Sequence, residues 1–230
     1  MKESEPRVFV VVDNRWVRTS IADVLMTEGY VVEKFASAAD YLARAPYTGP
    51  VCVILEAQLP GFDSLAFQQQ LAEEGRMEQI VFVTRKEDTR MAIEAMKGGA
   101  VDYLLEPFRR DGLLSAVARA LARSAEVVKS RARLAKLTPR ELEMFEWLIA
   151  GLINKEIVEE MGVKLRTIKE HRGRVMQKTG AVSVVELVRL AMKAGVAPAQ
   201  PKAVYRSNME LTASPPLANC RDLRNINASN

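Results

Sequence analysis

Polar side chains stand at or just past the ends of strand-like apolar runs in the first half of this chain. The positions are Val12-Asp13-Asn14, Glu56, Thr84 and Glu106. Because ligands bind beyond the carboxyl ends of parallel strands, we expect these separated positions to converge on one crevice. A carboxylate such as Glu56 at that edge could take part in chemistry. Neither a nucleophile with a nearby base nor a metal cluster accompanies it, so the sequence argues against an enzyme.

The elements that would position these residues are short β-rich runs that alternate with longer helical patterns. The expected strands are Val8–Val12, Tyr30–Phe35, Val51–Leu55, Ile80–Thr84 and Tyr103–Leu105. The expected helices are Trp16–Glu28, Ala38–Ala45, Ser64–Glu74, Asp88–Lys97 and one that begins near Asp111. Near-continuous apolar strands in such an alternation predict an α/β domain with a parallel sheet covered on both faces.

The second half of the chain reads as helical. Residues 116–137 are rich in Ala, Arg, Val and Lys and predict a helical linker, which is also a candidate dimer contact. Thr138-Pro139-Arg140-Glu141 is a helix-start signature. The helical segments that follow are Glu141–Ala150, Asn154–Glu160, Leu165–Thr179 and Ser183–Ala194. Short helices joined by glycine turns predict an all-α helix-turn-helix module.

These patterns divide the chain into an α/β domain at 1–117, a linker at 118–137, a helical domain at 138–197 and a mobile tail at 198–230. Charge follows the same division. Residues 1–117 hold 13 Lys/Arg and 18 Asp/Glu, a balance of −5, whereas residues 118–197 hold 16 and 9, a balance of +7. The two halves should therefore have different partners.

Composition and hydrophobic pattern limit which classes of protein this chain could belong to. With 230 residues, 48% of them hydrophobic, the chain can form two modest globular cores. No apolar run reaches about 18 residues and the N-terminus lacks a signal-peptide pattern, so we expect a soluble, cytoplasmic protein without membrane contact. Cys52 lies in an apolar run and Cys220 in a polar stretch, which argues against a disulfide. One histidine and no clustered thiols argue against a zinc site or a cofactor.

The segment Lys164–Lys178 carries a strong excess of positive charge. Helical spacing turns Leu165, Ile168 and Val175 inward and leaves a cationic face that matches the width of the B-DNA major groove. A merely solvated charged face is the alternative, but the preceding short helix and glycine turn complete a helix-turn-helix geometry. We therefore expect double-stranded DNA as the partner of this half.

Individual DNA contacts can be assigned within that geometry. Candidate phosphate contacts, which set position without reading sequence, are Lys155, Arg166, Thr167 and Arg172. Lys169 could donate to guanine, Glu170 could accept from cytosine, and Gly173 would allow close backbone approach. His171 falls on the inward side, which favours a structural role.

With these motifs in place, the chain resembles two-component response regulators of the FixJ/NarL group, with a LuxR-type output domain. In the output half the matching stretches are LTPRELEMFEWLIAGLINKEIVEEMGV, LRTIKEHRGRVMQKTGA and SVVELVRLAMKAG. In the first half they are Val17-Arg18, Leu59-Pro60-Gly61, Thr84, MAIEAMKGGAVDYL and Pro107-Phe108. The resemblance implies a flavodoxin-like receiver with a five-stranded parallel sheet and a four-helix DNA-binding domain. It also implies a homodimer on promoter DNA through the last helix, for which we expect contacts from Val184, Leu187, Val188 and Ala191.

Three positions of the receiver pocket depart from the family pattern. The family has two acids after the first strand that hold magnesium, and these positions are here Val12 and Asp13. The phosphate-accepting aspartate of the family falls at Glu56. The lysine that pairs with the phosphoryl group falls at Glu106. The positions that keep their residue types are Thr84 and the switch aromatic Tyr103. Without the lysine, and with an acceptor one methylene longer, we expect phosphorylation to fail. Close approach of Glu56 and Glu106 would add repulsion.

Several roles for such a receiver stay open. Glu56 could mimic the phosphorylated state, bonding to Thr84, or the pocket could be a relic on a domain kept for dimerisation or docking. In both cases a signal would arrive by contact, from a sensor histidine kinase or a sister response regulator. Alternatives are an antagonist that titrates such a partner and hardly binds DNA, or a regulator phosphorylated at a non-standard residue.

Overall fold

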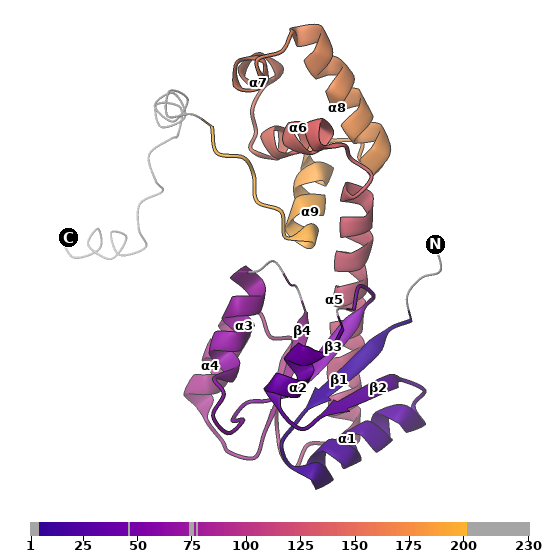
Figure 1. Cartoon of the computed structure of the whole chain (residues 1–230), viewed down its shortest axis with the longest axis vertical. Helices are drawn as coiled ribbons and strands as arrows, with labels where there is room; N and C mark the ends of the chain where they lie inside the picture. The colour runs from indigo at the N-terminus through magenta and orange to yellow at the C-terminus, as the bar shows by residue number, and fades with distance from the viewer. Residues whose placement is uncertain (1–4, 46, 74–75, 77, 202–230) are drawn as a thin grey trace, which may run out of the picture. The chain divides into compact units, whose positions relative to one another are not determined.

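The computed structural model describes residues 5–45, 47–73, 76 and 78–201 (Figure 1). The described residues divide into two compact units, one formed by those up to 136 with 188–196 and the other by 137–187 with 197–201. No helix among the described residues is long and apolar enough to cross a membrane. Of the expected mobile tail, residues 198–201 are described and the remainder lies outside the described residues.

The first unit contains an α/β domain. Among the described residues its strands are β1 (Arg7–Val11), β2 (Val31–Phe35), β3 (Val51–Glu56), β4 (Gln79–Thr84) and β5 (Asp102–Leu105). They form a parallel sheet in the order β2-β1-β3-β4-β5. The helices are α1 (Arg15–Thr27), α2 (Ala38–Ala43), α3 (Ser64–Glu73), α4 (Thr89–Lys97) and α5 (Arg110–Leu134). The five-stranded flavodoxin-like architecture predicted from the sequence is confirmed.

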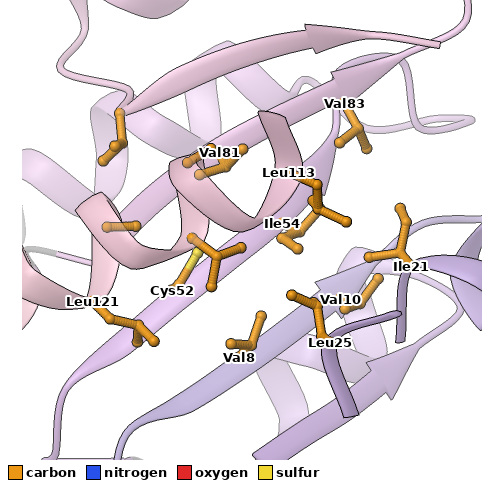
Figure 2. Packing of buried hydrophobic residues seen from close by; sticks show 14 of the residues in the cluster. Val8, Val10, Ile21, Leu25, Cys52, Ile54, Val81, Val83, Leu113 and Leu121 are labelled. Atoms are coloured by element: carbon orange, nitrogen blue, oxygen red, sulfur yellow. The ribbon is translucent and has the colours of Figure 1, made fainter. Parts of the chain in front are cut away.

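Apolar layers on both faces of the sheet explain why its strands are almost continuously hydrophobic. One layer joins Val8, Val10, Ile54 and Val81 to α1 and α5, through side chains such as Leu25 (Figure 2). The opposite face of the same strands packs against α2, α3 and α4, and α3 and α4 lie side by side (Figure 1). Successive side chains of a strand alternate between the two layers, so the central strands are buried throughout.

Helix α5 joins two segments that were predicted separately. A helix that begins near Asp111 and a helical linker at 118–137 were expected, and one helix of 25 residues, Arg110–Leu134, runs through both. Helix-favouring Ala, Arg and Leu continue from the part that packs on the sheet, through Val117 and Ala120, into the linker. Nothing in the sequence breaks the helix there, so the two expected segments form one element.

The second unit is helical and contains α6 (Pro139–Ile149), α7 (Asn154–Met161) and α8 (Leu165–Thr179), while α9 (Val184–Ala194) crosses the division between the units. The expected helix start at Thr138 is a capping box: its Oγ1 accepts from Glu141 N at 3.3 Å, and Glu141 Oε2 accepts from Thr138 N at 2.8 Å. The same carboxylate accepts from Lys178 Nζ at 2.6 Å, which joins α6 to α8.

The turn between α7 and α8 depends on Gly162. Its φ of 64° lies in the left-handed region, which glycine adopts without steric penalty. Buried Ile157 on α7 and Ile168 on α8 are among the residues that form the core on either side of this turn. The helix-turn-helix predicted from the glycine spacing is therefore present, and it presents one long face of α8 outward.

Candidate functional site

Two of the polar residues at the carboxyl edge of the sheet, Asp13 and Glu56, are in direct contact at the end of the central strand β3. Glu56 is 4% exposed, and its Oε2 accepts a hydrogen bond from the backbone N–H of Asp13 at 3.1 Å. The backbone N–H of Glu106 donates to the carbonyl of Thr84 at 2.8 Å, which joins the ends of β4 and β5. Parallel pairing of β1, β3, β4 and β5 thus brings the strand ends that would form the receiver pocket to one edge of the sheet.

A residue that sequence reasoning missed completes this pocket. Arg85 follows β4 directly, and its Nη2 lies 3.3 Å from Glu56 Oε1 and 3.8 Å from Asp13 Oδ1. The guanidinium therefore contacts both carboxylates, while about half of the Arg85 side chain remains exposed. The signal in the sequence was its place immediately after Thr84, at the same edge of the sheet as the acids.

Burial and neighbouring charge determine how the carboxyl groups titrate. Burial is the largest cause that raises the pKa of Glu56, and Asp13 raises it further, while Arg85 and the backbone hydrogen bond lower it. Burial also raises the pKa of Glu106, opposed by Arg85. The acidic neighbour that raises the pKa of Glu56 is therefore Asp13.

The loop that follows β1 is held by its own hydrogen bonds. Asn14 Oδ1 accepts from the backbone N–H groups of Trp16 at 3.0 Å and Val17 at 3.2 Å, so Asn14 caps α1. Arg18 Nη1 donates to the carbonyls of Val12 at 2.5 Å and Asp13 at 2.9 Å. These contacts orient the Asp13 N–H toward Glu56.

Thr84 and Tyr103 are the two positions that keep the family's residue types. Thr84 Oγ1 accepts from Lys86 N at 3.2 Å and lies 3.3 Å from the Lys86 carbonyl, both in the β4–α4 segment. The bond between Thr84 and Glu56 that the mimicry alternative would use is not among these contacts. The half-buried Tyr103 ring packs on Phe82 with centroids 6.1 Å apart, and burial raises the pKa of Tyr103.

The resemblance to response regulators implies a magnesium ion, and the side chains present do not fit one. Val12, at the first ligand position, is 1% exposed within the apolar core. The guanidinium of Arg85 already lies against the oxygens of Glu56 and Asp13, whereas Mg²⁺ requires near-octahedral oxygen ligands. In the part of the chain that the structure describes, no three His, Cys, Asp or Glu side chains are grouped to hold a metal ion.

A second candidate site is the outward face of α8. Lys169, Glu170 and Gly173 are exposed, and a side chain added at Gly173 would meet open space. Ile168 and Val175 are buried, as the helical spacing predicted. Leu165 was wrongly expected to be buried with them: it is 47% exposed, because it is the first residue of α8, where the packed face of the helix ends.

The remaining candidate DNA contacts differ in their exposure and in their hydrogen bonds to other side chains. Arg166, almost fully exposed, donates through Nε to Glu170 Oε1 at 3.1 Å along the helix. Arg172 Nη1 donates to Asn154 Oδ1 at 3.2 Å, which links α8 to the start of α7. Lys155 is exposed and Thr167 half-buried. The Nδ1 atom of His171 is buried, as its inward position implied.

Helix α9 distributes its apolar residues differently from the expected dimer face. Leu187 and Ala191 are buried within this chain, and Val184 and Val188 are half-buried. The large apolar side chains exposed on this helix or just before it are Val182, Val185 and Met192.

Two family models match the chain. The response regulator receiver domain matches residues 8–118, and the luxR family of bacterial regulatory proteins matches residues 135–191. The transcriptional regulatory protein FixJ of Azorhizobium caulinodans is 37% identical over 206 residues, which cover 86% of this chain and 97% of that relative. Nodulation protein W of Bradyrhizobium diazoefficiens is 35% identical over 196 residues, 82% of this chain and 86% of the relative. The low-resolution structure of the response regulator StyR, 34% identical, covers 83% of this chain and 100% of its own with a TM-score of 0.54.

Proposed function

Since the chain belongs to the response regulators that carry a receiver domain and a luxR-type DNA-binding domain, we propose that its receiver accepts no phosphoryl group. The chain is a DNA-binding transcriptional regulator, and under this proposal its receiver is controlled by protein contact. The observation that carries the proposal is the set of contacts made by the Glu56 carboxylate. Its two carboxylate oxygens are already engaged, by Asp13 N–H and by Arg85.

Phosphoryl transfer to a carboxylate depends on alignment and on cations that neutralise the developing charge. In this pocket Glu56 is one methylene longer than aspartate, and a misplacement of about 1 Å can cost ~100-fold in rate. Glu106 brings a carboxyl group to the position where the family has a lysine. The guanidinium of Arg85 is already paired with the acceptor carboxylate of Glu56. Before Glu56 could attack a phosphoryl donor, Arg85 would have to move away from it.

The contacts of Thr84 help to choose between the two roles left open for the receiver. A mimic of the phosphorylated state would draw the Thr84 hydroxyl toward the acidic acceptor. The hydroxyl instead bonds to Lys86, which favours a receiver retained for docking. We propose a sensor histidine kinase or a sister response regulator as the docking partner, because such proteins already recognise receiver surfaces.

We propose that the output half binds double-stranded promoter DNA as a homodimer. Lys155, Arg166, Thr167 and Arg172 would contact phosphates, and Lys169, Glu170 and Gly173 would meet base edges. The exposed, mostly cationic face of α8 supports this over an antagonist that only titrates a partner, since such an antagonist needs no cationic recognition face. The dimer would form through α9, where Val185 and Met192 are the apolar side chains left exposed on the helix.

Intact mass after treatment with a small acyl phosphate and magnesium tests the central claim. We expect no phosphorus adduct on the natural chain. The matched control is the double variant Glu56→Asp, Glu106→Lys, which restores two family residues. A stoichiometric adduct on the natural receiver, with tighter DNA binding, would refute the proposal, and mapping it to another side chain would support phosphorylation at a non-standard residue.

A further inference from the structure

The register between β3 and β4 places Arg85 near Glu56. Glu56 lies opposite Val83 in the parallel pairing of β3 and β4, and Arg85 follows two residues later. Arg85 is the first residue after β4, so the end of this strand lies beside the end of β3, where Glu56 stands. The Arg85 guanidinium then spans from Glu56 to Asp13, at 3.3 and 3.8 Å.

The neighbours of Arg85 hold its backbone close to this edge. On one side Thr84 is 2% exposed and ends β4. On the other side the backbone N–H of Lys86 donates to Thr84 Oγ1. The β4–α4 segment is thus folded back on the strand end, and the pairing of Arg85 with Glu56 adds a link between that segment and β3.

Guanidinium and magnesium would compete for the same carboxylate oxygens. Arginine stays charged at any physiological pH and its donors lie in a planar fork. A divalent cation would need the same oxygens of Glu56 and Asp13, and it would be repelled by a positive charge within a few ångströms. Because Arg85 is joined to the chain, its effective concentration at the pocket exceeds that of any free ion.

We propose that Arg85 is a built-in counter-cation that takes the place of the divalent ion in this receiver and joins the β4–α4 segment to Glu56. The inference rests on the proposed function, because a receiver without phosphotransfer has no need of a metal ion. It goes beyond that function by naming the residue that makes the resting pocket independent of magnesium.

Calorimetric titration of Mg²⁺ into the full chain tests the proposal. The natural protein should show no binding at millimolar Mg²⁺. The dissociation constant of Arg85→Ala for Mg²⁺ should be at least about tenfold lower than that of the natural protein, because two neighbouring carboxylates lose their counter-charge. Arg85→Lys should behave like the natural protein. Arg90→Ala, which removes the same charge from an exposed position on α4, is the matched control and should change nothing. Adding Glu56→Gln to Arg85→Ala should abolish the new binding.

Equal Mg²⁺ affinity in the natural protein and Arg85→Ala would overturn the proposal. A second readout covers a variant that folds poorly: the melting temperature of the natural protein should not rise with Mg²⁺, and a rise would itself overturn the proposal. Failure of the proposed function would look different, because it would be a phosphorus adduct on the natural chain or a lack of DNA binding. Neither of these depends on the titration.

Discussion

Lys169 and Arg166 share the exposed face of α8, yet alanine at each position should weaken DNA binding in a different way. Lys169→Ala removes a proposed donor to guanine, and it should cost about 1–3 kcal/mol on the preferred sequence, roughly 5- to 150-fold, with little change on random DNA. Arg166→Ala should weaken binding to every sequence. Its link to Glu170 is an exposed ion pair worth at most about 1 kcal/mol, so a phosphate can readily replace it.

Salt dependence separates the two effects. Each phosphate contact contributes about −0.9 to the slope of log affinity against log salt, so Arg166→Ala should reduce the slope of a dimer by about 2. The assay is fluorescence anisotropy with a duplex selected by the natural protein and a random duplex, each at several salt concentrations. Melting temperatures of both variants serve as the folding control. Equal losses on both duplexes for Lys169→Ala would refute the assignment of Lys169 to base reading.

Other predictions concern stability and assembly. Hydrogen bonds from Lys178 and from the Thr138 backbone lower the pKa of Glu141 to about 2, below its unfolded value of about 4.3. Its contribution to stability is therefore present above pH ~4.3 and is lost as the pH falls toward 2. In thermal melts, Glu141→Gln should flatten that dependence. Gly98→Ala would bring a Cβ to 2.8 Å from Gln68 Oε1. It should cost about 1 kcal/mol by displacing this buried amide, but should stabilise in a Gln68→Ala background, where denaturant unfolding would show the reversal. Met192→Glu should shift the proposed dimer to monomer in analytical ultracentrifugation, and a dimer that persists in this variant would exclude this face of α9.

The predicted strands and helices of the receiver agree with the structure to within two residues at each end. Local patterns suffice there because a fully buried parallel strand must be continuously apolar, and because caps such as Ser37 act on their own turn, where its Oγ accepts from Asp40 N at 3.1 Å. The end of α5 was harder to predict. A helix can continue past the surface of its domain wherever residues such as Ala and Arg favour it, and no local signal marks where packing stops.

Sequence alone determined the α/β and helix-turn-helix architecture, the convergence of Glu56 with Asp13, and the cationic face of α8, because these follow from periodicity, strand order and charge. Tertiary structure decided which charges actually meet. Arg85 reaches Glu56 through the register between β3 and β4, and Asp13, rather than Glu106, became the acidic neighbour. The burial of Leu187 and the exposure of Met192 on α9 likewise depend on what packs against the helix. Such contacts join residues far apart in the chain, and the interaction of two side chains depends on distances that no local pattern encodes.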